Sequence, residues 1–308
     1  MGKKSKRSTS PLLIISIIII ICSISLCVLL FYKKRNIIKE IDNINIEYTE
    51  KETLLKEKQD ELKELENKLS ITNDIDNNIS NMRQKYYSNI KTLEDKILAG
   101  ESDKKIAYLT FDDGPYYLTH TILGILDQYD VLVTFFTIGN NKTTCYDNRN
   151  ANCHLYNEEA KRGHTMANHT YSHGIRYGLY NSTDSFITQV KKQEELIKNE
   201  TGYTTNIVRF PGGSATAGRL KNSIIDRLRE NGYGWVDWTA STGDGGSLAS
   251  ADQAWNNFIS TIDNKIEVVL MHDYSGYTAQ ILGREIEYLR ENGYYLAPLF
   301  YESSMINK

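Results

Sequence analysis

The chain has 308 residues, of which 40% are hydrophobic and 24% charged, and its formal net charge is −3. This length accommodates one domain of about 200 residues together with accessory segments. No region is strongly basic, so the composition argues against nucleic-acid binding.

The first informative element is the uncharged run at residues 11–32, which is dominated by Ile and Leu. It is long enough to span a bilayer as a helix. Four basic residues precede it and three follow it, which favours a cytoplasmic tail at residues 1–10. A cleaved signal peptide is the alternative, but no small-x-small site precedes Lys33. We therefore predict an uncleaved transmembrane anchor in the cell membrane, with the rest of the chain extracellular.

Residues 33–100 contain no Pro, and their only Gly is Gly100. A heptad frame that starts at Ile41 places apolar residues on one seam and Glu and Lys on its flanks. The seam is imperfect and is weakest at residues 72–78, where we expect a break or hinge. The pattern predicts a helical or coiled-coil stalk that could self-associate. The alternative is a single solvated helix lying on the domain that follows.

The four cysteines fall into two pairs. Cys22 and Cys27 lie inside the apolar run, whereas Cys145 and Cys153 lie in or beside a polar segment that is typical of a loop. In an oxidising exterior the second pair could close a short disulfide, and two unrelated thiols are the alternative.

After Lys104, short apolar runs alternate with helical stretches. Strands are predicted at residues 106–111, 131–138, 165–168, 207–210, 233–238, 268–271 and 295–299. Helices are predicted at residues 117–129, 156–162, 185–201, 218–231, 250–262 and 278–292. This alternation favours parallel strands with right-handed crossovers, and polar motifs repeatedly follow the strands, where barrel enzymes build their sites.

Two adjacent carboxylates, Asp112 and Asp113, stand at the end of the first predicted strand, in Thr-Phe-Asp-Asp-Gly-Pro. Because side chains alternate between the two faces of a strand, these neighbours can take different tasks. One can bind a metal ion while the other stays free as a base. An acidic surface turn is the alternative.

A second motif, His169 to His173, has the spacing His-x-x-x-His. In one helical turn this spacing stacks two imidazoles on the same face, a usual way to hold zinc or a similar divalent ion. A pair of surface histidines is the alternative. Of the other histidines, His164 is expected to form a structural hydrogen bond, and His120 and His154 are expected at the surface.

Three further motifs follow in order: Arg209-Phe210-Pro211-Gly212-Gly213, the segment from Trp238 to Asp244, and Leu270-Met271-His272. With the first two motifs, this order resembles the five-motif series of the polysaccharide deacetylase family (NodB-homology domain, carbohydrate esterase family 4). The resemblance covers roughly residues 104–300. It implies an α/β fold, a distorted (β/α)7-type barrel, for a domain at residues 101–308 that follows the anchor at 11–32 and the stalk at 33–100.

The resemblance also implies roles for individual residues. Asp113, His169 and His173 would bind a divalent metal ion, zinc in the first place, although cobalt or another divalent ion also fits this set. Asp112 would be the general base, and Arg209 would hold the Asp112 carboxylate.

Further roles concern the substrate side of the site. The backbone N–H of Gly212 would stabilise the oxyanion, and His272 would be the general acid. Trp238 and Leu270 are candidates for the pocket of the acetyl methyl group, or are ordinary core residues. Many relatives carry a larger residue, often Tyr, in place of Gly212.

Either Asp244 or Asp237 would orient His272. Asp237 is followed by Trp238, as is usual in the family, but lies early in the chain. Asp244 has the better spacing and is favoured, although Gly245 follows it where the family usually has Trp.

The function implied is N-deacetylation of an acetylated cell-envelope glycan, and the chain resembles membrane-anchored bacterial peptidoglycan deacetylases. Peptidoglycan N-acetylglucosamine is the expected substrate, and the expectation rests on location and family. A chitin-oligomer or poly-N-acetylglucosamine deacetylase, an O-acetyl esterase and a catalytically silent wall-binding scaffold are the alternatives.

Overall fold

The computed structural model describes residues 11–139 and 154–308. The tail at residues 1–10 and the cysteine pair Cys145 and Cys153 therefore lie outside the described residues. The chain divides into two compact units, Met1–Asn81 and Met82–Lys308. The second is called the C-terminal unit below.

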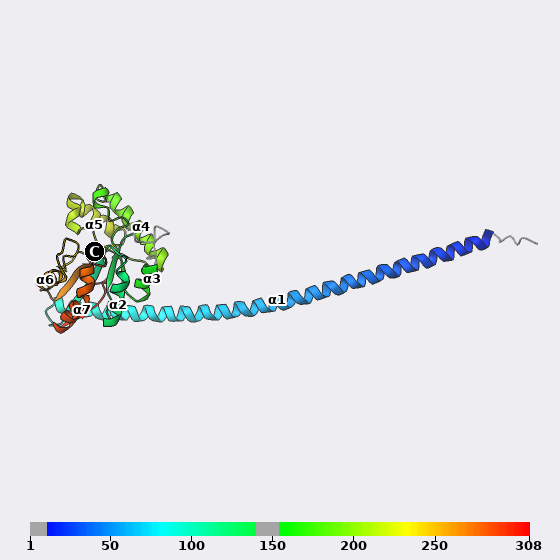
Figure 1. Cartoon of the computed structure of the whole chain (residues 1–308), viewed down its shortest axis with the longest axis horizontal. Helices are drawn as coiled ribbons and strands as arrows, with labels where there is room; N and C mark the ends of the chain where they lie inside the picture. The colour runs from blue at the N-terminus through cyan, green and yellow to red at the C-terminus, as the bar shows by residue number, and fades with distance from the viewer. Residues whose placement is uncertain (1–10, 140–153) are drawn as a thin grey trace, which may run out of the picture. The chain divides into compact units, whose positions relative to one another are not determined.

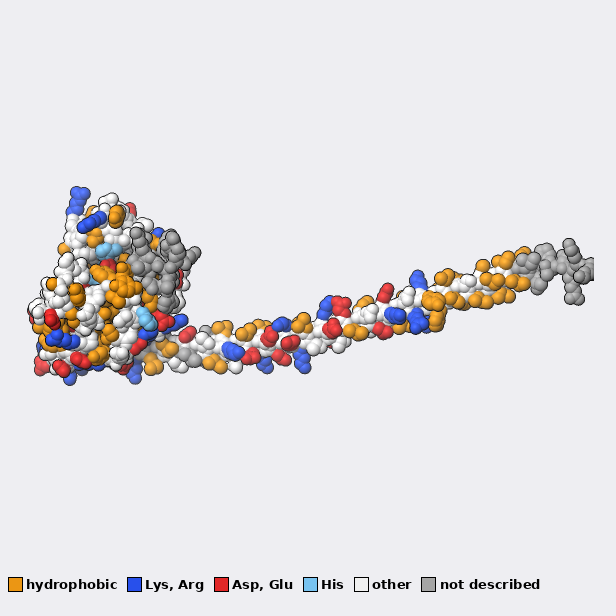
Figure 2. Space-filling model, in the orientation of Figure 1, with side chains coloured by type: hydrophobic (Ala, Val, Ile, Leu, Met, Phe, Trp, Pro, Cys, Tyr) orange, Lys and Arg blue, Asp and Glu red, His pale blue; other side chains and the backbone are white. Residues whose placement is uncertain are grey.

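The first described element is the helix α1, Pro11–Leu98. Its first part is apolar and exposed, and charged side chains follow along it (Figure 2). Ion pairs one turn apart support the charged part, as between Lys51 and Glu47 at 2.6 Å. The helix continues through residues 72–78, so the predicted break there is wrong; the segment is polar but has no Pro or Gly to interrupt the helix. By length and composition alone, α1 is apolar enough near its start to cross a membrane.

The last turns of α1 belong to the C-terminal unit. Ile90 and Ile97 are buried in a core cluster of that unit. Glu94 is buried on the same side of the helix and accepts hydrogen bonds from Tyr108 Oη (2.5 Å), Ser303 Oγ (2.5 Å) and the Ser304 N–H (2.9 Å). The compact unit thus begins at Met82 and takes in residues that the sequence assigns to the stalk.

One curled parallel sheet organises the C-terminal unit (Figure 1). Its described strands are β1 Lys105–Asp112, β2 Thr134–Thr137, β3 Thr165–Asn168, β4 Ile207–Val208, β5 Gly234–Trp235, β6 Ala240–Ser241, β7 Ile266–His272 and β8 Tyr294–Leu296. Their order is β5-β4-β3-β2-β1-β7-β6, and β8 pairs with the first residues of β1. The predicted α/β distorted barrel is confirmed. The two-residue strand β6 was not predicted.

Helices lie outside this sheet (Figure 1). They are α2 Thr119–Tyr129, α3 His154–Lys161, α4 Thr183–Thr201, α5 Lys221–Glu230, α6 Ala251–Thr261 and α7 Gly276–Glu291, with 3-10 turns η1 Ile175–Tyr177 and η2 Ser214–Leu220. Three of them begin at a serine whose side chain accepts a backbone N–H of the first turn, namely Ser182, Ser250 and Ser275. The observed bounds show that each predicted helix is present within a few residues of its expected bounds.

The central strand β1 separates two cores. Its side chains at positions 107, 109 and 111 pack with α2 and α7 in the outer core. Ile106 and Tyr108 belong to the inner core, together with the end of α1. Because side chains alternate along a strand, Thr110 and Asp112 continue the inner face. The carboxylate of Asp112 therefore lies inside the curled sheet at its carboxyl edge.

Candidate metal and catalytic site

Asp112 and Asp113 are directed to different places, as the sequence predicts. Asp112 is the last residue of β1 and is 2% exposed. Asp113 follows with a left-handed backbone (φ 72°), and its N–H donates to the carbonyl of Phe136 on β2. A left-handed aspartate is uncommon and marks a turn that the surrounding structure must hold in place.

His169 and His173 lie on the loop after β3, so the predicted helical turn is wrong. Thr170 (φ 64°) and His173 (φ 49°) are left-handed, which no α-helix allows. Asn168 Oδ1 accepts the Thr170 N–H at 2.9 Å, and Thr170 Oγ1 accepts the His173 N–H at 3.3 Å. This loop, rather than a helix, brings the two imidazole rings to a centroid separation of 5.0 Å.

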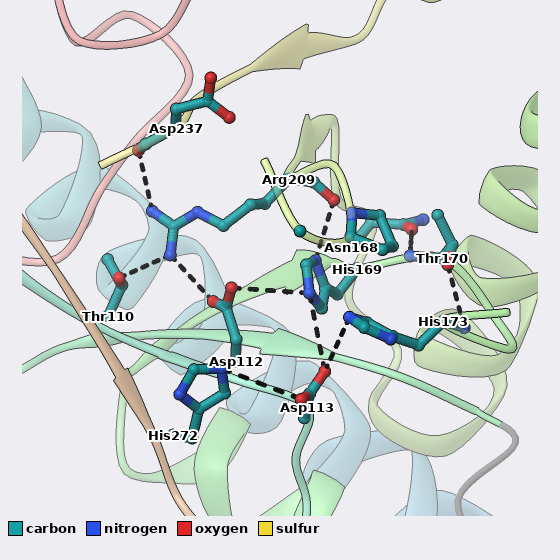
Figure 3. Close-up of polar contacts among 12 residues, drawn as sticks. Thr110, Asp112, Asp113, Asn168, His169, Thr170, His173, Arg209, Asp237 and His272 are labelled. Carbon is teal, nitrogen blue, oxygen red and sulfur yellow. Dashed lines mark hydrogen bonds and ion pairs between the residues drawn. The ribbon is translucent and has the colours of Figure 1, made fainter. Parts of the chain in front are cut away.

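The side chains of Asp113, His169 and His173 could hold a metal ion. One ligand atom from each lies within 4.8 Å of the others, and the Nε2 atoms of both histidines are 3.5–3.6 Å from Asp113 Oδ1 (Figure 3). His169 Nδ1 donates to the carbonyl of Arg209 at 2.9 Å, which leaves the Nε2 lone pair directed at the carboxylates.

The protonation of His169 also suits a metal ligand. Burial, and then the charge of His173, lower the pKa of His169 to about 3, so this imidazole is neutral at physiological pH. Two neutral nitrogens and one carboxylate form the donor set of a divalent cation with open coordination positions.

Arg209 holds Asp112 in place. The fully buried guanidinium donates from Nη1 to Asp112 Oδ1 (2.8 Å) and to Thr110 Oγ1 (2.7 Å). Its remaining nitrogens donate to backbone carbonyls, and it lies 4.0 Å from the ring centre of Phe136. Burial raises the pKa of Asp112, and the charge of Arg209 opposes that rise. Thr110 was missed by sequence reasoning, although it shares the inner face of β1 with Asp112.

His272, at the end of β7, contacts Asp244 and not Asp237. Its Nδ1 lies 2.8 Å from Asp244 Oδ1, and its backbone N–H donates to Asp244 Oδ2 at 2.8 Å. The Thr278 hydroxyl also donates to Oδ2. Asp237 instead accepts the N–H and the hydroxyl of Ser214, at 2.9 and 2.6 Å. Of the two candidates, only Asp244 can orient the imidazole.

The environment of His272 keeps it protonated at neutral pH. Burial lowers the pKa of His272, but the hydrogen bond and the charge of Asp244 outweigh burial and raise the pKa to about 9. Its Nε2 lies 3.9 Å from Asp113 Oδ2 (Figure 3). The site thus places a protonated imidazole, His272, and a buried carboxylate, Asp112, beside the candidate metal-binding cluster (Figure 3).

The substrate-side candidates lie around the same edge. Gly212 is left-handed (φ 74°), and a Cβ there would lie 3.2 Å from Ile175 Cδ1. The indole of Trp238 covers the next residue, Gly213, at 3.1 Å from the position of a Cβ. Leu270 is buried on β7, paired with β1 and β6.

Asp273 was also missed, although it follows His272 directly. It is fully buried and accepts the hydroxyl of Thr119, which in turn accepts the Tyr116 N–H at 2.7 Å. A Cβ on Gly114 would lie 2.2 Å from Asp273 Oδ2, so only glycine fits there. These contacts join the end of β7 to the turn that follows Asp113, and no pattern in the sequence signals them.

Two further histidines, His164 and His120, are not part of the cluster. His164 accepts the Val133 N–H on Nδ1 at 3.2 Å, which confirms its predicted structural role. His120 is exposed on α2, as predicted. The side chain of His154 lies outside the described residues.

Comparison with known proteins agrees with this geometry. Residues 99–234 match the family described as Polysaccharide deacetylase. A peptidoglycan-N-acetylglucosamine deacetylase of Bacillus cereus is 30% identical over 197 residues, which cover 62% of this chain and 68% of that protein. A chitin deacetylase of Colletotrichum lindemuthianum is 30% identical over 193 residues, 60% of this chain and 74% of that protein. The solved catalytic domain of a peptidoglycan N-acetylglucosamine deacetylase from Eubacterium rectale superposes with a TM-score of 0.60 and 32% identity, over 67% of this chain and 93% of that one.

Proposed function

The chain belongs to the polysaccharide deacetylase family, and from that premise we propose that it is a metal-dependent hydrolase of the N-acetyl groups of peptidoglycan, with N-acetylglucosamine as the preferred sugar. One observation carries the proposal. The cluster of Asp113, His169 and His173 lies next to two groups: a buried carboxylate, Asp112, 3.5 Å from His169 Nε2, and a protonated imidazole, His272, 3.9 Å from Asp113 Oδ2. Amide hydrolysis needs a base that takes the proton of the attacking water and an acid that protonates the leaving nitrogen.

The three cluster residues would hold the divalent cation, zinc foremost, with cobalt or another divalent ion as the alternative. When bound, the cation supplies Lewis-acid polarisation of the acetyl carbonyl and lowers the pKa of water. The hydrogen bond from His169 Nδ1 to the Arg209 carbonyl fixes which ring nitrogen is available.

Asp112 is the proposed general base. It takes a proton from the attacking water while the water oxygen bonds to the acetyl carbon. Arg209 holds one carboxylate oxygen at 2.8 Å and so fixes the direction of the other, Oδ2, which faces His169 Nε2 at 3.5 Å. The raised pKa of Asp112 makes it a better proton acceptor than an exposed aspartate.

His272 is the proposed general acid. It donates the Nε2 proton to the sugar nitrogen as the C–N bond breaks, which yields acetate and a free amine. Asp244 accepts Nδ1–H and orients the ring. The Gly212 N–H would stabilise the oxyanion, and Trp238 and Leu270 would surround the acetyl methyl group.

The proposal includes the membrane anchor at residues 11–32, a stalk within residues 33–100 and the deacetylase domain at 101–308. The length and composition of the start of α1 support a single-pass anchor in the cell membrane. The excess of basic residues before the anchor supports a cytoplasmic N-terminus and an extracellular deacetylase. The seam of apolar residues along the stalk supports self-association.

The test uses the full chain in detergent, with purified peptidoglycan and with N-acetylglucosamine oligomers, and measures released acetate. We expect release that a chelator abolishes and added zinc restores. His169→Ala should remove both the activity and the bound metal, whereas His120→Ala, at an exposed histidine, serves as the matched control. Chelator-resistant release, or full activity of His169→Ala, would refute the metal-dependent mechanism.

The likeness to a chitin deacetylase supports a second candidate substrate, chitin or poly-N-acetylglucosamine oligomers. The same assay separates the two, because the oligomers would be turned over faster than peptidoglycan. In digested cell wall, the ratio of glucosamine to muramic acid, the two sugars with a free amine, would then identify which wall sugar is deacetylated.

A further inference from the structure

Three tyrosines form a row of rings that begins at His272. Tyr274 stacks obliquely on the imidazole of His272, with ring centroids 5.0 Å apart. Tyr116 meets Tyr274 edge-on at 5.9 Å, and Tyr117 meets Tyr116 at 4.8 Å. The row therefore joins the turn after Asp113 to the loop after β7.

The row changes from half-buried to exposed along its length. Tyr274 and Tyr116 are partly buried, whereas 61% of Tyr117 is exposed. Hydrophobic side chains gather beside acidic and histidine side chains on one face of the C-terminal unit (Figure 2). An exposed tyrosine that continues a packed aromatic cluster is a feature of binding surfaces, because water solvates its ring poorly.

The position of the row specifies its ligand. In the proposed mechanism His272 protonates the nitrogen that leaves with the sugar, which places the sugar ring on the side of His272. A pyranose presents a C–H face that can cover an aromatic ring and hydroxyl edges that can bond to a tyrosine O–H. Tyrosine also orders at little entropic cost, since it has only two side-chain torsions.

We propose that Tyr274, Tyr116 and Tyr117 form an extended glycan subsite, which binds the pyranose rings next to the one that is deacetylated. This inference rests on the proposed deacetylase function. Tyr274 would contact the reacting sugar from the side of His272, and Tyr117 would contact a more distant ring of the same chain. The protein would therefore act on the interior of polymers faster than on disaccharides.

The test compares full-length wild type with Tyr117→Ala on N-acetylglucosamine disaccharide and hexasaccharide. The readout is the ratio of kcat/KM for the hexasaccharide to that for the disaccharide. Loss of one stacked ring should lower this ratio about five- to tenfold, through KM for the hexasaccharide. Tyr117→Phe keeps the ring and should restore most of the ratio. Tyr48→Ala, at a tyrosine of α1 with 64% exposure, is the matched control.

The outcomes separate this inference from the proposed function. If the wild type does not favour the hexasaccharide, or if Tyr117→Ala keeps the full ratio, the subsite is refuted while the deacetylase function stands. If the wild type releases no acetate, the proposed function fails. Calorimetric binding of the hexasaccharide to chelator-treated protein then decides the subsite, since Tyr117→Ala should weaken it five- to tenfold if the row binds glycan.

Discussion

Two buried carboxylates lie beside β1, one along its first half and one at its last residue, and they are held in opposite ways. Glu94, beside the first half of the strand, accepts three hydrogen bonds from uncharged donors of Tyr108, Ser303 and Ser304. Asp112, at the last residue of the strand, is bonded by the cationic Arg209 and faces an imidazole at 3.5 Å.

Burial of a carboxylate therefore does not by itself identify a reactive group. The hydrogen bonds from neutral donors to Glu94 link three segments of the chain, so its role is structural. The surroundings of Asp112 combine one charged partner with nearby titratable groups, which suits the role of proton acceptor that we propose for it. Variants at the carboxyl end of β1 should therefore change activity, and variants near Glu94 should change stability.

The largest effect is expected at the metal-binding cluster. Asp113→Ala removes the only carboxylate among the three grouped ligands of the described residues, so metal should be lost. The variant would lose the several kcal/mol by which the metal stabilises the transition state, so its kcat/KM should fall about 1,000-fold. Metal content and acetate release on the same preparation check this. An Asp113→Ala protein that retains stoichiometric metal would contradict the ligand assignment.

The next effect concerns the pH profile. The charge of Asp244 raises the pKa of His272 against the effect of burial, so Asp244→Asn should lower that pKa. A general acid works only while protonated; the alkaline limb of activity should therefore move to lower pH, and kcat should fall about 10- to 100-fold.

Profiles of kcat against pH for Asp244→Asn and Asp237→Asn test this assignment. Asp237 bonds to Ser214 and not to His272. The alkaline limb of Asp237→Asn should therefore lie at the same pH as in the wild type, even if kcat changes. A shift in Asp237→Asn alone would reverse the assignment.

A smaller effect is expected at Gly245, next to Asp244. A Cβ there would lie 2.7 Å from His272 Cε1, and His272 is bonded to Asp244 through both its ring Nδ1 and its backbone N–H. A misplacement of about 1 Å costs about 100-fold, so the smaller displacement in Gly245→Ala should lower kcat about tenfold. Gly246→Ala is the control, because its Cβ would make only ordinary contact, at 3.5 Å from the Gly243 carbonyl. Equal kcat values for Gly245→Ala and Gly246→Ala would contradict this explanation.

The smallest effect on activity, and the clearest on stability, is expected at Glu94. Glu94→Ala leaves buried donors of Tyr108 and Ser303 without an acceptor, at a cost of about 2–4 kcal/mol in the free energy of unfolding. Acetate release per folded molecule should not change. Denaturant unfolding and active-site titration measure the two quantities separately. A stable but inactive Glu94→Ala protein would contradict the contrast between Glu94 and Asp112.

The sequence predicts the repeating architecture well because each strand and helix carries its own period. It predicts that Asp112 and Asp113 diverge, because alternation along a strand is local. It fails for His169 and His173, since spacing alone cannot reveal that Thr170 and His173 are left-handed. It also fails for Asp273 and Thr110, whose partners lie far away in the chain and are set by strand register.

The inner face of β1 has a consequence for how errors in folding would show themselves. Tyr108, Thr110 and Asp112 occupy that face in turn, from the contact with Glu94 to the proposed base. A slip of one residue against β7 would turn all three toward the outer helices at once. A molecule with this register error would lose its activity completely and not in part. The hydrolysis rate of a preparation should therefore be proportional to the number of molecules in which β1 and β7 are correctly paired.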